Sequence, residues 1–248
     1  MSAAGAIAVS GANRGIGAAI ASELLQRGFT VGALSRSGQP PVGLDLAPAA
    51  RSRLIACACD VTDETAVKAA LATVAGAAGG LKGLVNNAGI HAEGRSHQLA
   101  TTEFEKMMAT NATAVFVACR EAYPHLAAAG GGIIVNIGSF FDKLGVKRNL
   151  AYCASKAAVG AITRCLAVEW AGANIRVLDV APGYIDTDLN HAALAGGPLK
   201  DFLERRIPAG RPGTPQQVAR LVASIFSEDI PFLTGETIYL DGGQGMAH

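Results

Sequence analysis

Aromatic residues, long apolar runs and an excess of charge of either sign are all scarce in this sequence. Aromatic residues make up 5% and charged residues 17% of the chain, and 21 lysines and arginines stand against 20 aspartates and glutamates. Because no basic stripe or acidic tail stands out, we expect no binding to nucleic acid. No apolar run reaches the roughly 18 residues that a membrane-spanning helix needs, so no membrane partner is expected. The N-terminus lacks the basic start and cleavage site of a signal peptide, which predicts a cytoplasmic protein.

Cysteine and histidine are few and unclustered. The odd number of cysteines, their apolar surroundings and the lack of a C-x-x-C pair predict buried, inert thiols rather than a disulfide framework. These cysteines are Cys57, Cys59, Cys119, Cys153 and Cys165. The five histidines show no H-x-x-x-H spacing, so no metal site is expected.

Small aliphatic side chains are abundant. Half of the 248 residues are hydrophobic, mostly alanine, valine, isoleucine and leucine, a composition typical of a parallel sheet buried on both faces. Short β-rich runs predict strands: Ile7–Ser10, Thr30–Leu34, Arg53–Cys59, Gly83–Asn86, Ile133–Gly138, Ile175–Val180 and Thr237–Leu240. Helical periodicity predicts helices between them: Ile16–Arg27, Asp63–Ala77, Thr102–Leu126, Tyr152–Trp170 and Pro215–Phe226.

The regular alternation of these strands and helices requires right-handed crossovers and a parallel sheet. The sequence therefore predicts an α/β fold, a doubly wound parallel sheet of about seven strands with helices on both faces, in a single domain over residues 1–248. Asp63 and Thr214-Pro215 are typical helix starts. The many small residues between Tyr184 and Pro198 predict a mobile segment beside the substrate, extending over about residues 184–206.

A glycine-rich turn directly follows the first predicted strand and leads into a helix. In this turn Gly11 permits a sharp bend, Gly15 lets the backbone approach a pyrophosphate, and Gly17 allows the helix to pack closely on the strand. The helix N-terminus then presents free N–H groups and the positive end of its dipole to phosphate. With a strand before it and a helix after it, the turn predicts a dinucleotide site.

The spacing Gly-x-x-x-Gly-x-Gly resembles that of the short-chain dehydrogenase/reductase family, and further matches extend over essentially the whole chain. The matching residues are Asp60-Val61, Asn86-Asn87-Ala88-Gly89, Asn111, Ser139, Tyr152, Lys156, Pro182-Gly183, Thr187 and Gly242-Gly243, while Ser10 replaces the usual threonine. The resemblance implies a Rossmann-type fold and a nicotinamide cofactor. The cofactor-binding residues are then expected to be Gly11, Asn13, Arg14, Gly15, Ile16, Gly17, Ser35, Arg36, Asp60, Val61, Asn87, Ala88, Gly89, Tyr152, Lys156, Pro182, Gly183, Ile185 and Thr187.

The end of the second predicted strand bears on the choice of cofactor. A free ribose 2′-hydroxyl favours a carboxylate there, whereas a 2′-phosphate favours arginine. Ser35 stands where the family's aspartate would be, and Arg36 follows at once. Arg14 occupies the second position at which family members place a base for the phosphate. We therefore favour NADP, with NAD as the alternative.

Tyr152 and Lys156 lie four residues apart at the start of a predicted helix, so their side chains share one face. A neighbouring ammonium favours the phenolate, and we expect it to lower the pKa of the tyrosine so that the phenol can act as a general acid or base. Ser139 follows the fifth strand and is expected to hold the substrate oxygen. Asn111 is a polar amide among apolar helical residues and calls for a partner; in the family it bends the helix and holds a water that leads to the lysine.

The substrate is less clearly marked. The loop Phe140–Leu150 predicts an apolar pocket wall with solvated charges outside, or alternatively a site for an anionic substrate. Related 3-oxoacyl-carrier-protein reductases carry arginines before the fifth and sixth strands, whereas residues 127–132 and 171–174 contain no base here. We therefore favour a small ketone or secondary alcohol, with carrier-protein reduction second.

Three further alternatives and the oligomeric state complete these expectations. A catalytically idle regulator would be expected to lose Tyr152 or Lys156, and a methyltransferase would leave both without purpose. Enoyl reductases of the family have a wider tyrosine–lysine spacing, and extended epimerases have longer chains. Family members pair through the two helices that correspond to Thr102–Leu126 and Tyr152–Trp170, so the resemblance implies a homo-oligomer, a tetramer or a dimer.

Overall fold

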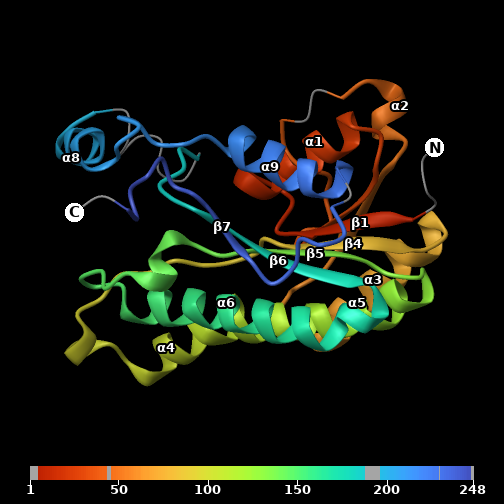
Figure 1. Ribbon diagram of the computed structural model, residues 1–248, viewed down its shortest axis with the longest axis horizontal. Coiled ribbons are helices and arrows are strands. Elements are labelled where there is room, and N and C mark those ends of the chain that lie inside the picture. The colour runs from red at the N-terminus through yellow and green to blue at the C-terminus, as the bar shows by residue number, and fades with distance from the viewer. Residues whose placement is uncertain (1–4, 44–45, 188–195, 229, 247–248) are drawn as a thin grey trace.

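In the computed structural model, which describes residues 5–43, 46–187, 196–228 and 230–246, all strands belong to one parallel sheet. Its seven strands lie in the order β3-β2-β1-β4-β5-β6-β7 (Figure 1). They are β1 Ala6–Ser10, β2 Thr30–Ser35, β3 Leu54–Ala58, β4 Leu81–Asn86, β5 Gly132–Ile137, β6 Ile175–Pro182 and β7 Thr237–Leu240. All seven predicted strands are confirmed, with ends displaced by up to two residues. The predicted doubly wound fold is therefore correct.

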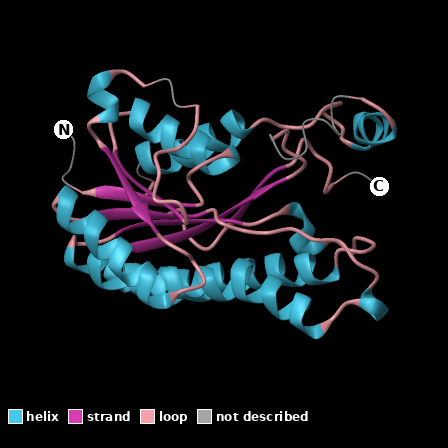
Figure 2. Ribbon diagram, turned by 180° about the vertical axis from the view of Figure 1, so that it is seen from behind, coloured by secondary structure: helices cyan, strands magenta, loops and turns pink. Residues whose placement is uncertain are grey.

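Helices cover both faces of the sheet (Figures 1 and 2). One layer holds α1 and α9, and the opposite layer holds α3, α5 and α6. The α-helices are α1 Gly15–Gln26, α2 Pro48–Arg51, α3 Glu64–Ala78, α4 Thr101–Met108, α5 Ala114–Ala128, α6 Leu150–Trp170, α8 Pro198–Arg206 and α9 Pro215–Ser227. Within the part of the chain that the structure describes, no helix is both long and apolar enough to cross a bilayer.

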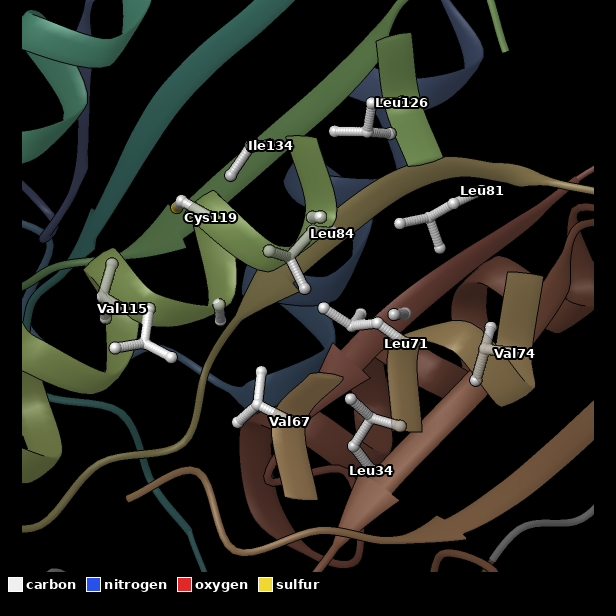
Figure 3. Close-up of a cluster of buried hydrophobic side chains, with 14 of the residues drawn as sticks. Leu34, Val67, Leu71, Val74, Leu81, Leu84, Val115, Cys119, Leu126 and Ile134 are labelled. Carbon is white, nitrogen blue, oxygen red and sulfur yellow. The ribbon is translucent and has the colours of Figure 1, made fainter. Parts of the chain in front are cut away.

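Two apolar clusters, one on each face of the sheet, form the core. Figure 3 shows the cluster between the sheet and the α3/α5 layer, where Leu71 and Leu84 are fully buried. On the opposite face, Ile20 and Leu24 of α1 pack with Val222 of α9. Each large aliphatic side chain buried in this way stabilises the fold by about 1.5–3 kcal/mol. The core therefore fixes the sheet as a rigid support for the loops at its carboxyl edge.

Both predicted helix starts are confirmed. The Asp63 carboxylate accepts hydrogen bonds from the backbone N–H groups of Thr65 at 2.9 Å and Ala66 at 3.1 Å. At the start of α9, Thr214 and Gln217 form a reciprocal capping box, and Pro215 occupies the first turn. These caps satisfy N–H groups that have no partner inside the helix.

The helix predicted over Thr102–Leu126 is not a regular α-helix. A π-helical turn, Ala109–Thr113, separates α4 from α5. Such a turn inserts an extra residue into the helical ladder, and it often lies at a functional site. Here it contains Asn111, whose side chain is turned inward.

Three other expectations need correction or restriction. The short helix α2 and the helix α8 were not predicted, and α8 occupies part of the segment 184–206 that was expected to be mobile. Residues 188–195 of that segment lie outside the described residues. The thiol of Cys165 is exposed rather than buried, because this position of α6 faces away from the sheet, and Cys57 and Cys153 are only half-buried.

Candidate active site

The candidate residues converge at the carboxyl edge of the sheet. The neighbours of β1 are β2 and β4, so the order of the strands reverses at β1. Ligands of open α/β sheets bind at such a reversal, beyond the carboxyl ends of the strands. The glycine turn follows β1, the N-N-A-G segment follows β4, and Ser139 follows β5. Residues that are far apart in the sequence therefore meet along one edge.

Two glycines of the turn, Gly11 and Gly17, have no room for a side chain. Gly11 has φ +64°, and a Cβ atom there would lie 2.9 Å from the Cα of Ala88. A Cβ atom on Gly17 would lie 2.3 Å from the carbonyl oxygen of Gly11. Arg14 at the N-cap of α1 makes no capping hydrogen bond with its side chain. Among the described residues, the first turn of α1 is therefore uncapped by that residue, a geometry that fits the pyrophosphate of a dinucleotide.

Ser10 joins the glycine turn to the N-N-A-G segment. Its Oγ accepts hydrogen bonds from the backbone N–H groups of Asn87 at 3.0 Å and Ala88 at 3.1 Å. In return, Asn87 Nδ2 donates to the carbonyl oxygen of Ser10 at 3.0 Å. From the sequence, Ser10 stands out only as a replacement for threonine. The hydroxyl that it shares with threonine makes these contacts, so that hydroxyl was the signal that Ser10 holds the two segments together.

No acidic residue stands at the end of β2. Ser35 is buried, and its Oγ lies 3.2 Å from Ser37 Oγ. Arg36 and Arg14 are exposed, and neither guanidinium forms a hydrogen bond or an ion pair with the residues that the structure describes. Hydrogen bonds from Thr62 keep the pKa of Asp60 below its usual value, with a smaller contribution from Arg36. Two arginine side chains are therefore available to a ligand at this edge of the sheet.

The remaining cofactor-binding candidates lie in the segments that follow the strands or at their ends. Val61 and Ala88 border a small cavity beside Ser10. Gly183 packs against the backbone of Asp241, and the methyl group of Thr187 lies 4.0 Å from where a Cβ atom of Gly15 would be. The carbonyl oxygen of Asn13 accepts a hydrogen bond from Val42 N–H, and Ile16 packs on the core. Pro182 ends β6, and Ile185 forms a β-bridge to Gly213.

Asn111 is the buried centre of a hydrogen-bond cluster. It is 1% exposed, which excludes an ordinary surface amide. Its Oδ1 accepts from Ile90 N–H at 2.9 Å, and its Nδ2 donates to the Ile90 carbonyl at 2.9 Å and to Ser155 Oγ at 3.1 Å. Asn111 thus ties the π-helical turn to the loop after β4 and to α6. The sequence context of Asn111 predicted a hydrogen-bond partner for its amide, and these contacts supply one.

Ser139, Tyr152 and Lys156 lie together. Ser139 is buried, and a hydrogen bond with it acts to lower the pKa of Tyr152. The Nζ of Lys156 lies 5.7 Å from the centroid of the Tyr152 ring, as expected for residues one turn apart on α6. The Nζ also donates a hydrogen bond of 2.8 Å to the carbonyl oxygen of Ile137 at the end of β5.

The expected effect on the pKa of Tyr152 is wrong for the protein chain by itself. Burial raises the pKa of Tyr152, and this effect outweighs the lowering by Ser139. Burial also lowers the pKa of Lys156 to about 8, against the raising effect of Asp179. The low polarity of the site therefore disfavours both charged forms. Burial in the chain alone therefore favours the protonated phenol of Tyr152.

An aromatic and imidazole wall surrounds the tyrosine. The rings of His91 and Phe141 both contact the Tyr152 ring edge-on, with centroid distances of 4.8 and 5.9 Å. Tyr184 packs edge-on against Phe141, with a centroid distance of 6.2 Å. That the loop Phe140–Leu150 forms an apolar wall of the substrate pocket stays a prediction. His91 was missed by the sequence analysis, although it directly follows the N-N-A-G-I string.

Comparisons with known proteins agree with this fold. The fold and site define a dinucleotide-binding oxidoreductase. A family model described as enoyl-(acyl carrier protein) reductase, one of the short-chain dehydrogenase/reductase models, matches residues 11–244. The chain belongs to the short-chain dehydrogenase/reductase family, whose members act on alcohols and ketones with a nicotinamide cofactor.

Similar proteins include enzymes with different substrates. The 2-(R)-hydroxypropyl-CoM dehydrogenase of Xanthobacter autotrophicus is 36% identical, with 94% of this chain and 96% of the relative covered. The 3-oxoacyl-[acyl-carrier-protein] reductase MabA of Mycobacterium tuberculosis is also 36% identical, with 98% and 93% covered.

Solved structures extend the likeness to the whole fold. A short-chain type dehydrogenase/reductase from Mycobacterium marinum has a TM-score of 0.88 and 30% identity, over 97% of this chain and 95% of that one. ElxO with NADP bound has a TM-score of 0.90 and 29% identity, over 98% and 99%.

Proposed function

We propose that the protein is an NADP(H)-dependent oxidoreductase that interconverts a small ketone and a secondary alcohol, with Tyr152 as the general acid and base. The observation that carries this proposal is the position of Ser139, Tyr152 and Lys156 together at the sheet edge, the same edge as a glycine turn in which Gly11 and Gly17 have no room for a side chain. The chemistry of a carbonyl reduction requires such a proton donor within reach of the substrate oxygen.

The roles of the side chains follow from their positions. The nicotinamide, when bound, supplies or accepts hydride at the substrate carbon. Ser139 holds the substrate oxygen and stabilises the negative charge that develops on it. Tyr152 gives its proton to that oxygen during reduction and takes it back during oxidation. The ammonium of Lys156 favours the phenolate that remains on Tyr152 and binds the ribose hydroxyls of the cofactor.

The choice of NADP rests on the adenosine end of the site. Arg36 and Arg14 carry guanidinium groups suited to bidentate contact with a 2′-phosphate, and Ser35 stands in place of an acid. The solved structure of ElxO contains NADP, which adds support from a relative. An NAD-dependent enzyme is the alternative, and titration with both cofactors distinguishes the two.

Carrier-protein reduction is the second candidate, because MabA is among the similar proteins. Against it, residues 127–132 and 171–174 offer no arginine or lysine to an acidic carrier. A free ketone needs no carrier-docking surface, and the rings of His91 and Phe141 beside Tyr152 offer it apolar contact. We therefore place the small substrate first.

Self-association is a further part of the proposal. Val168 on α6 is 81% exposed and Phe116 on α5 is 42% exposed. Exposed apolar side chains of this size can pack against a second copy of the chain. We propose a homo-oligomer, a dimer or tetramer, that forms through these faces, which sedimentation velocity tests directly.

The central experiment follows NADPH oxidation with a panel of small ketones, 3-oxoacyl thioesters and 3-oxoacyl carrier protein. We expect turnover with at least one free ketone and a rate about 10²–10⁴-fold lower for Tyr152→Phe. The variant should still bind NADPH. Tight NADPH binding without oxidation of any substrate would favour an idle regulator, and turnover confined to the carrier-bound substrate would favour the second candidate.

A further inference from the structure

A buried carboxylate, Asp179, lies in β6 and has no role in the proposed chemistry. Its neighbours in the strand, Leu178 and Val180, are apolar, and Asp179 is 0% exposed. In the register of the sheet, Asp179 lies opposite Asn136 of β5, so the two side chains share a face. Asn136 Nδ2 donates to Thr163 Oγ1 of α6 at 2.9 Å. The carboxylate therefore points into the layer between the sheet and α6.

The polar partners of Asp179 are few. Thr237 Oγ1 donates to its Oδ2 at 3.3 Å, whereas Oδ1 has no hydrogen-bond partner among the described residues. A Cβ atom on Gly138 would lie 2.4 Å from Oδ1, so the carboxylate packs on the backbone directly before Ser139. A buried carboxylate with an unsatisfied oxygen costs free energy unless an opposite charge lies near it.

The opposite charge is that of Lys156. Its Nζ donates to the Ile137 carbonyl on β5, and Ile137 lies opposite Val180, the residue after Asp179. Lys156 is 6% exposed. Each of the two groups acts electrostatically on the other in the direction that favours charge. Two buried charges of opposite sign therefore lie where β5, β6 and α6 meet.

The other charged and titratable groups near this pair are Asp142, Tyr239 and Arg164. Asp142, in the 3-10 turn Phe140–Lys143, acts on Asp179 with the same sign of charge. Its Oδ2 accepts a hydrogen bond of 2.8 Å from Tyr239 of β7. Arg164 of α6 acts on Tyr239 rather than on the pair. Lys156 is thus the cation among the described residues that offsets the charge of Asp179.

We propose that Asp179 is a positioning residue, whose charge keeps Lys156 in its ammonium form beneath Tyr152. This inference rests on the proposed function, because it assigns to that lysine the task of favouring the phenolate. Asp179 acts through Lys156 and does not itself contact the substrate. Its contact with Gly138 also places it directly beneath the backbone that carries Ser139.

The protonation states agree with this role near neutral pH. Burial raises the pKa of Asp179 to about 6, and burial lowers the pKa of Lys156 to about 8. Both groups are therefore charged between these two values, which is the range in which the pair can operate. Above it the lysine loses its proton, and below it the carboxylate gains one.

The test measures the pKa of Lys156 directly, by NMR of protein labelled with a carbon isotope at lysine Cε. The resonance is assigned by its loss in Lys156→Met. In Asp179→Asn, which keeps the volume of the side chain, we expect the pKa of Lys156 to fall by about one unit. The matched control is Asp142→Asn, which removes the neighbouring carboxylate and should leave the pKa of Lys156 unchanged. An unchanged pKa in Asp179→Asn overturns the proposal.

The pH profile of ketone reduction gives a second readout. The decline of kcat/KM at alkaline pH should move toward acid by the same interval in Asp179→Asn, and a merely structural residue would lower the rate equally at every pH. The NMR titration needs no turnover. If the wild type reduces no ketone but the pKa of Lys156 still falls in Asp179→Asn, the proposed function is contradicted and the pairing of Asp179 with Lys156 stands.

If Asp179→Asn does not fold, the reciprocal experiment replaces it. Lys156→Met removes the cation, so the pKa of Asp179 should rise further, as read from the labelled carboxyl carbon. A carboxyl pKa that is the same in Lys156→Met and in the wild type overturns the pairing.

Discussion

Replacement of Gly17 by alanine tests the tightest contact of the proposed dinucleotide cradle. The new methyl group would lie 2.3 Å from the carbonyl oxygen of Gly11 and 2.5 Å from Asn87 Nδ2. Both distances are below van der Waals contact, and the first involves backbone that cannot move without shifting the turn. Overpacking of this kind costs about 1–3 kcal/mol. This cost exceeds the gain of up to about 1 kcal/mol that alanine brings to a helix.

A second glycine in a helix provides the matched control. Gly76 is exposed on α3, and a Cβ atom there would have no atom within 4 Å. Gly76→Ala should therefore raise the free energy of unfolding by about 0.5–1 kcal/mol. The same substitution should thus change the free energy of unfolding in opposite directions at the two positions, which separates a steric effect from helix propensity.

Urea unfolding of the three proteins measures both effects, and titration with NADPH measures the consequence for binding. Gly17→Ala should lower the free energy of unfolding and weaken NADPH binding at least tenfold, because the turn must shift to admit the methyl group. Gly76→Ala should bind NADPH like the wild type. Equal stability and equal NADPH affinity for Gly17→Ala and the wild type would refute the reasoning.

Four further outcomes are expected. Thr214→Ala removes the N-cap of α9 and should cost about 1 kcal/mol in urea unfolding. Asn111→Ala leaves the Ile90 peptide without its partners and should cost about 1–3 kcal/mol by the same measurement. Arg36→Ala should raise the Kd for NADP in a fluorescence titration while that for NAD stays constant. Because the folded pKa of Asp179 is raised to about 6, the protonated form stabilises the fold at low pH. Wild-type stability should therefore fall by ~3 kcal/mol relative to Asp179→Asn between about pH 4 and 7.

Patterns with a local cause were predictable from the sequence. The sheet followed from short aliphatic runs that alternate with helical periodicity, and the cap at Asp63 followed from its side chain and the acid after it. The convergence of Ser139, Tyr152 and Lys156 also followed, because the carboxyl ends of parallel strands meet at one edge. Their roles stay predictions, which the experiments above test.

Features set by tertiary packing were not predictable in the same way. The π-helical turn at Asn111 depends on hydrogen bonds to Ile90 and Ser155, which come from distant segments. The direction of the pKa shift of Tyr152 depends on how deeply the phenol is buried, and sequence spacing does not give this. Asp179 was visible as a lone acid in an apolar strand, but its neighbour Lys156 is found only once β5, β6 and α6 are assembled.

The raised pKa of Tyr152 also bears on the direction of the proposed reaction. A phenol that burial keeps protonated is in the form that ketone reduction needs, whereas alcohol oxidation needs the phenolate. The ammonium of Lys156 favours that phenolate, but it persists only up to about pH 8, the pKa of the lysine in the protein. Deprotonation of the lysine thus competes with deprotonation of the tyrosine as the pH rises. We therefore expect reduction to be the faster direction at neutral pH, and oxidation to gain from alkaline pH only until the lysine loses its charge.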